Sequence, residues 1–231
     1  MLVSGIRIGI TEEEKLVTRR LVFEKEKVER IRRLEASRSE VKDSSRVEAV
    51  SAFLWRSFIE VHKQCAGESE TASFPAAHMV SLRRRAVPPV ADHAFGNCFT
   101  FAAAVVSADE EKDGYGDMAV SRLRAAIREV DGDYVEAIGD EEFAREVLNN
   151  IGDVFTKENC VFTSWLRFPF YEVDFGWGKP GRVCTAMMPY MNLVILMDTP
   201  SGDGGIEAWI NVCDDHFFSF IKANCDTLLL H

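Results

Sequence analysis

The chain has 231 residues, of which 47% are hydrophobic and 28% charged, and this composition is typical of a globular protein with room for one large domain. Its formal net charge of −10 argues against a nucleic acid or an anionic membrane surface as the main partner. The six cysteines form no Cys-x-x-Cys pair, and the first residues hold only a short apolar run. We therefore expect reduced thiols, no secretory signal and a cytoplasmic protein.

Strands and helices are both expected along the chain. Residues 44–63 show the clearest helical pattern, because their apolar side chains fall on one stripe and Ser45 and Glu48 have the spacing of a capping box. The other segments do not alternate regularly as strand, helix and strand, which predicts an α/β protein with a mixed sheet. The expected strands are 16–23, 74–85, 98–107, 160–168, 182–198 and 204–212, and the expected helices are 24–38, 44–63, 118–138, 141–151 and 214–230.

The start of the 44–63 helix gathers groups that suit an anion. Ser44, Ser45 and Arg46 stand at the expected first turn, and Lys42 comes just before it. Free N–H groups at a helix N-terminus, together with hydroxyls and cations, make a natural phosphate site. Simple capping of the helix explains the same residues equally well.

Other polar clusters predict turns and charged surfaces. Cys213 and His216 are three residues apart, but no second pair is spaced to complete a tetrahedral site, so we expect no metal. The segment 202–205 is rich in glycine, lacks the Lys and Ser/Thr of a phosphate-binding loop, and predicts a turn. If the strand expected at 74–85 continues to its end, Arg83 and Arg85 share one of its faces.

The stretch "DFGWGKP" (174–180) combines turn-forming glycines with aromatic residues that favour burial. Together with the residues before it, as "FTSWLRFPFYEVDFGWGKP" (162–180), it resembles the signature region of the BAHD acyltransferases. These plant enzymes transfer acyl groups from coenzyme A to alcohols or amines. Segments 44–57, 80–97 and 204–212 resemble further family segments in the family's order, so the resemblance covers nearly the whole chain. The aromatic sequence is most similar to the vinorine synthase-like branch of alkaloid acetyltransferases.

The resemblance implies a chloramphenicol acetyltransferase-like lobe of two layers, with a mixed β-sheet and flanking helices. Residues 1–231 would form this single lobe, which is the C-terminal half of a two-lobe enzyme. In such enzymes the chain after the "DFGWG" turn crosses to the other lobe. We therefore expect residues 174–200 to project from the body, to pack unusually or to pair with a second copy of the chain, because an unpaired apolar strand favours association.

The family's general base is the histidine of a His-x-x-x-Asp motif. None of the five histidines in this chain is followed by aspartate four residues later. A positioned general base typically increases the reaction rate about 10²–10⁴-fold, so we expect the chain alone to be inactive. The alternative is a truncated, non-catalytic remnant that binds a ligand or partner without turnover.

For substrates, the resemblance implies acyl-CoA, acetyl-CoA above all, as co-substrate and no tightly bound cofactor. It implies that Lys42, Ser44, Ser45 and Arg46 hold the nucleotide phosphate of coenzyme A. The second substrate would be a small alcohol such as an alkaloid or terpenoid, and no nucleic acid or membrane is expected as a partner.

For the remaining motif residues, the resemblance implies two further roles. Thr163 and Trp165 occupy positions on the acceptor and oxyanion side, where a hydroxyl and an indole N–H can donate; ordinary core contacts are the alternative, more so for Trp165. In the family the aspartate of "DFGWG" pairs with an arginine, which makes Arg83 the first candidate partner of Asp174, and Arg85 the second. The structural motif itself comprises Asp174, Phe175, Gly176, Trp177 and Gly178.

Overall fold

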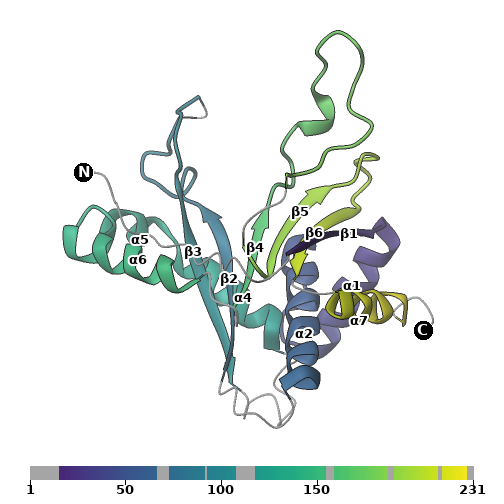
Figure 1. The fold of residues 1–231 in the computed structure, drawn as a ribbon. Coiled ribbons are helices and arrows are strands. Elements are labelled where there is room, and N and C mark those ends of the chain that lie inside the picture. Colours follow the sequence, from purple (N-terminus) through teal and green to yellow (C-terminus); the bar gives the residue numbers. More distant parts are fainter. Residues whose placement is uncertain are drawn as a thin grey trace.

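The computed structural model describes residues 16–66, 73–91, 93–107, 118–154, 159–186, 190–212 and 215–227. Its centre is a six-stranded mixed sheet with the order β1-β6-β5-β4-β2-β3 (Figure 1). β4 pairs in parallel with β2 and with β5, while the β1–β6, β5–β6 and β2–β3 pairs are antiparallel. The strands are β1 (Val17–Phe23), β2 (Ser73–Ser81), β3 (Phe99–Ser107), β4 (Cys160–Ser164), β5 (Leu193–Asp198) and β6 (Ile206–Val212).

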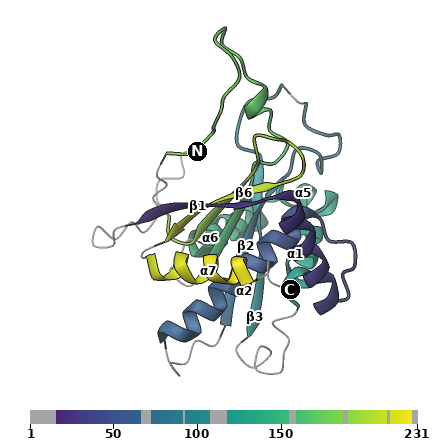
Figure 2. The same ribbon diagram turned by 90° about the vertical axis from the view of Figure 1, so that its right-hand side faces the viewer.

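Helices α1, α2, α4 and α7 cover one face of this sheet, and α2 contacts the other three. Figure 2 shows α1 and α7 beside α2. The helices are α1 (Lys25–Arg38), α2 (Arg46–Ala66), α4 (Ala119–Glu129), α5 (Gly132–Ala137), α6 (Glu141–Val154) and α7 (Asp215–Thr227), and Phe170–Glu172 form the short 3₁₀ helix η2. The expected mixed sheet with flanking helices is confirmed. None of the described helices is both long and apolar enough to cross a membrane.

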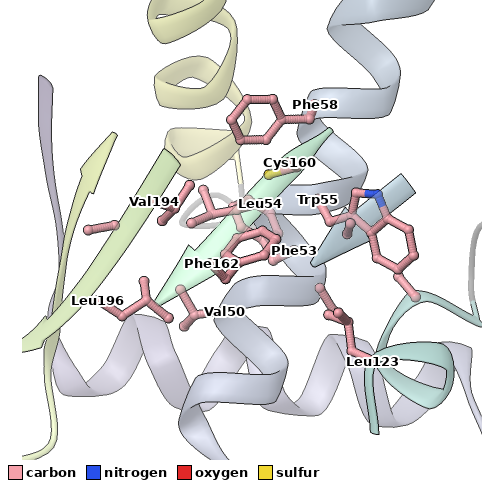
Figure 3. Close-up of a cluster of buried hydrophobic side chains, with 14 of the residues drawn as sticks. Val50, Phe53, Leu54, Trp55, Phe58, Leu123, Cys160, Phe162, Val194 and Leu196 are labelled. Carbon is pink, nitrogen blue, oxygen red and sulfur yellow. The ribbon is translucent and has the colours of Figure 1, made fainter. Parts of the chain in front are cut away.

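The main core lies between α2 and the central strands. Leu54 and Trp55 of α2 and Phe162 of β4 are almost completely buried, and Leu123 of α4 closes the cluster on one side (Figure 3). Burying one such side chain stabilises the fold by about 1.5–3 kcal/mol. The apolar stripe that the sequence of α2 shows is therefore the stripe that packs on the sheet.

The opposite face of the sheet carries a second, smaller cluster. Because side chains alternate along a strand, Val161 and Ile195 point away from α2. Val154 at the end of α6 packs against this cluster, as do Phe170 and Val183 from the long β4–β5 connection. In the described chain this face thus has much lighter cover than the face under α2.

Several expected elements are shorter than the sequence pattern indicated, among them the strands expected at 160–168 and 182–198, which are observed as β4 and β5. The segment 118–138 forms two helices, because Asp131 leaves the helical conformation and its side chain accepts a hydrogen bond from the backbone N–H of Tyr134, which caps α5. The strand expected at 74–85 ends at Ser81, so Arg83 and Arg85 lie in a turn rather than on one strand face.

Candidate functional site

The predicted phosphate site at the start of α2 contains the expected capping box. The backbone N–H of Ser45 donates to Glu48 Oε2 at 2.8 Å, and the N–H of Glu48 donates to Ser45 Oγ at 3.2 Å. Arg124 of α4 donates to both carboxylate oxygens of Glu48, from Nε at 2.8 Å and from Nη2 at 2.9 Å. It also binds Asp43 through Nη1 at 2.7 Å, so a residue of another helix fixes this turn.

Ion pairing with Arg124 affects the pKa of the Glu48 carboxyl in this turn. Burial raises the pKa of Glu48, but the hydrogen bonds from Arg124 and Ser45 outweigh that effect and leave the pKa lower than that of an ordinary glutamate. The same carboxylate, with that of Asp43, raises the pKa of Arg124. Glu48 is therefore ionised near neutral pH and faces the first turn of α2.

Lys42 and Ser44 differ in how available they are to a phosphate. Lys42 Nζ donates to the carbonyls of Ala36 and Ser39 at 2.6 and 2.8 Å, which caps the C-terminal end of α1. Ser44 is 1% exposed, and its Oγ has no hydrogen-bond partner in the described part of the chain. Its carbonyl accepts from Arg32 Nε at 2.8 Å. An unpartnered buried hydroxyl beside a helix N-terminus is compatible with a ligand oxygen at this position.

Arg46 links this helix start to the sheet. Its Nη1 lies 3.4 Å from Asp198 Oδ1, at the carboxyl end of β5. The parallel neighbour β4 ends at Ser164, opposite Leu196, so Trp165 follows at the same edge of the sheet. The structure thus brings the 42–46 segment and the Thr163–Trp165 region to one end of the sheet.

Thr163 and Trp165 lie on the face opposite α2. Thr163 is 7% exposed within β4, and Trp165 is half-buried against Phe170, with 5.9 Å between ring centroids. The backbone N–H of Trp165 donates to the carbonyl of Leu196 at 2.7 Å, which continues the pairing of β4 with β5. Both side chains could donate to an oxyanion on this face, and both also have the core contacts of the alternative interpretation.

The "DFGWG" turn lies on an exposed excursion that we call the arm (residues 166–186, Figure 1). Asp174 Oδ1 accepts from the backbone N–H groups of Gly176 and Gly178 at 2.7 and 3.0 Å, and these bonds lower its pKa. Both glycines have positive φ, 104° and 106°, which other residues rarely adopt. Phe175 and Trp177 are 74% and 83% exposed, so this turn is exposed rather than buried.

The expected pair between Asp174 and Arg83 is not formed in the described structure. Arg83 instead donates to the carbonyls of Ala94 and Gly96 at 2.8 and 2.7 Å, and so holds the β2–β3 loop. Arg85, the second candidate, donates to the carbonyls of Ile127 and Val130 and caps the end of α4. Backbone carbonyls close to each arginine in space satisfy the guanidinium groups, while Asp174 is satisfied within its own turn.

The expected crossover at 174–200 is wrong at its C-terminal end. Residues 193–198 form β5, which is paired on both sides by β4 and β6, and residues 193–197 are buried. A strand that is buried on both faces has the same continuous apolar sequence as an unpaired one, so sequence alone does not separate them. Residues 187–189 lie outside the described residues, and the exposed part is the arm before them.

Arg124 and Asp198 were not identified from the sequence. Arg124 lies in an ordinary amphipathic helix, and its distance of 76 residues from Glu48 leaves no local signal. Asp198 has a weak signal, since it is the first charged residue after a buried apolar strand. Among the described residues no group of three or more His, Cys, Asp or Glu could hold a metal, and the side chains of Cys213 and His216 lie outside the described part.

Comparisons with known proteins identify the family of this chain. The Transferase family profile matches residues 7–227. Stemmadenine O-acetyltransferase of Catharanthus roseus is 41% identical over 204 residues, which are 88% of this chain and 46% of that protein. Vinorine synthase of Rauvolfia serpentina is 36% identical over 206 residues, 89% of this chain and 46% of its own.

Solved structures give the same result for the fold. The crystal structure of vinorine synthase superposes with a TM-score of 0.75 at 32% identity, covering 94% of this chain and 48% of that one. The F. graminearum TRI101 complex with coenzyme A and deoxynivalenol superposes with a TM-score of 0.70 at 18% identity, which shows a shared fold alone. The chain spans about half the length of the curated relatives it matches, consistent with the C-terminal lobe.

Proposed function

The chain belongs to the Transferase family, that of the BAHD acyltransferases, and from this membership we propose that it forms the C-terminal lobe of an acyl-CoA-dependent O-acyltransferase of plant specialised metabolism. The observation that carries the proposal is the 41% identity with an O-acetyltransferase over 88% of the chain. Acetyl-CoA would be the donor, and a small-molecule alcohol such as an alkaloid or terpenoid the acceptor.

In this proposal the start of α2 binds the phosphate on the ribose of coenzyme A. Arg46 supplies a cation. The Ser44 hydroxyl, which has no partner among the described residues, and the first N–H groups of α2 supply hydrogen-bond donors. Lys42 contributes positive charge from its position at the end of α1 rather than as a free ligand. Ser45 organises the turn by capping it, and its N–H is already bound by Glu48.

Thr163 and Trp165 would act on the acceptor side of the reaction. The acceptor oxygen attacks the thioester carbonyl as it loses its proton, the carbonyl oxygen becomes an oxyanion, and the coenzyme A thiolate then leaves. The hydroxyl of Thr163 and the indole N–H of Trp165 are donors suited to that developing charge. In this proposal the proton acceptor comes from outside this sequence, in which no His-x-x-x-Asp occurs.

Reconstitution tests the proposal. The 231-residue chain is assayed for acetyl-CoA-dependent ester formation by mass spectrometry, alone and co-expressed with the vinorine synthase segment that precedes its matched half. We expect turnover only with the added lobe. Turnover by the pure chain would refute the requirement for an external base.

The second candidate, a non-catalytic binding remnant, is favoured by the missing motif. It predicts that the co-expressed lobe associates with the chain without any turnover. The affinity for coenzyme A tests the substrate part of the proposal separately from turnover. Arg46→Glu should weaken coenzyme A binding, whereas Arg33→Glu, on the exposed side of α1, should leave this affinity unchanged. Equal affinity in both variants would leave the start of α2 as a simple cap.

A further inference from the structure

The base of the arm is a turn with an unusual residue. Trp165, the first residue of the turn, accepts from the backbone N–H of Phe168 at 3.3 Å, and the third residue, Arg167, has φ of 67°. A turn with positive φ at its third residue ordinarily has glycine or asparagine there, because a Cβ is strained in this region. A contact from elsewhere is therefore needed to hold Arg167 in this conformation.

Asp198 provides that contact. Its Oδ2 accepts from the backbone N–H of Arg167 at 2.6 Å, a short bond to a charged acceptor. Its other oxygen, Oδ1, lies 3.4 Å from Arg46 Nη1. The strand before Asp198 is central in the sheet and buried, so the carboxylate projects from a rigid support. One side chain thus joins the end of β5, the first turn of α2 and the first turn of the arm.

We propose that Asp198 is a positioning residue that sets the direction in which the arm leaves the sheet and at the same time holds the Arg46 guanidinium at the start of α2. The second half of this inference rests on the proposed function, because it concerns the phosphate of coenzyme A. The first half depends only on the contacts of the carboxylate. Coupling arises because the two oxygens of one group cannot move independently.

Two substitutions separate these roles. Asp198→Asn keeps an oxygen that can accept from the N–H of Arg167 but loses the charge that attracts Arg46. Asp198→Ala loses both. Asp203→Ala is the matched control: Asp203 lies in the following turn, and its carboxylate accepts from the backbone N–H of Gly205 at 3.0 Å, without a contact to Arg46 or Arg167.

Hydrogen exchange on the 231-residue chain tests the anchor. We expect Asp198→Ala to speed exchange at the Arg167 amide about tenfold or more, Asp198→Asn to have a smaller effect, and Asp203→Ala to have none there. Asp198→Ala should also lower the melting temperature, because it leaves the positive φ of Arg167 without support. Arg167→Gly in that background should raise the melting temperature again but not restore the slow exchange, because glycine removes the strain without replacing the bond. Unchanged exchange at Arg167 in Asp198→Ala would overturn the inference.

The link to Arg46 is tested by the ratio of two affinities, that for coenzyme A and that for dephospho-coenzyme A, which lacks the phosphate on the ribose. Both are measured on the chain with the added lobe. Both Asp198 variants should lower this ratio several-fold, a change that general loss of structure does not produce. If Arg46→Gln changes the ratio but Asp198→Asn does not, the link to Arg46 is wrong. If Arg46→Gln leaves the ratio unchanged while exchange at Arg167 responds as expected, the proposed phosphate site fails and the arm anchor stands.

Discussion

Replacing Arg124 with methionine should destabilise the start of α2 from a distance. Methionine keeps the apolar stem of the side chain, which is 13% exposed, and removes only the guanidinium. Glu48 is then left in a half-buried position with the N–H of Ser45 as its remaining described partner. The variant thus tests whether α4 holds the turn that we propose for phosphate binding.

The magnitude follows from the contacts that are lost. Two bonds join the guanidinium to the Glu48 carboxylate, at 2.8 and 2.9 Å, and the Glu48 side chain is 16% exposed. Breaking a fully buried pair from one side costs about 3–5 kcal/mol, and a hydrogen bond to a charged group about 1.5–3 kcal/mol. Partial exposure places this pair at roughly 2–3 kcal/mol. The contact with the exposed Asp43 should add little, because water screens it.

Urea unfolding of the variant at pH 7 measures this loss, with Arg128→Met as control. Arg128 lies one turn further along α4 and is exposed, so its replacement should change the free energy of unfolding by less than about 1 kcal/mol. A double-mutant cycle of Arg124→Met with Glu48→Gln isolates the pair. A coupling energy below about 0.5 kcal/mol would refute the assignment of the stabilisation to this pair.

The pH dependence gives a second check on the same variant. The pKa of Glu48 is lower in the folded protein than in the unfolded chain, so its ionisation contributes stability above about pH 5. That contribution disappears as the pH falls through the folded-state pKa. The difference between wild type and Arg124→Met should therefore be largest near neutral pH and shrink in acid; a difference that grows on acidification would contradict the sign.

Three further predictions concern the arm and the strand after it. Asp174→Ala should speed amide exchange at Gly176 and leave the thermal midpoint of unfolding unchanged, because the described hydrogen bonds of this carboxylate lie within its own turn. A large drop in the thermal midpoint would instead show that Asp174 stabilises more of the lobe than this turn. In hydrogen-exchange time courses of the isolated chain, the amides of residues 193–197 should be among the slowest to exchange, because β5 is paired on both sides. Rapid exchange at these amides would contradict the central position of β5 in the sheet. Trp177→Ser should leave stability unchanged, since the ring is 83% exposed, but weaken association with an added lobe in a pull-down; equal recovery of that lobe would exclude a docking role.

The elements with strong local signals were predictable from the sequence. The α2 helix combines a capping box with a continuous apolar stripe, and both signals depend on residues a few positions apart. The split between α4 and α5 was missed because Asp131 and Gly132 permit either a continued helix or a new cap, and only the capping bond to Tyr134 decides between them. Contacts such as Arg124 with Glu48 join distant segments, for which spacing carries no information.

The assignment of residues 193–198 failed for a physical reason that applies to many central strands. An apolar run without alternation fits a strand buried on both faces as well as one that awaits a partner chain. The resemblance favoured the second interpretation, and for residues 193–198 that expectation is wrong. Pairing decides the question, because β4 and β6 satisfy both edges of this strand within the same lobe.

The connection between β4 and β5 also bears on the candidate acceptor side. These strands are parallel neighbours, so the chain has to travel back along the sheet between them, and in most α/β proteins a helix that covers the sheet makes this crossover. Here the exposed arm makes it, with the short η2 helix, and Phe170 and Val183 from this connection pack on the cluster around β4 and β5. Thr163 lies on that face of β4, so we expect the Asp198 anchor, which holds the base of the arm, to affect the cover of the acceptor side in the proposed reaction.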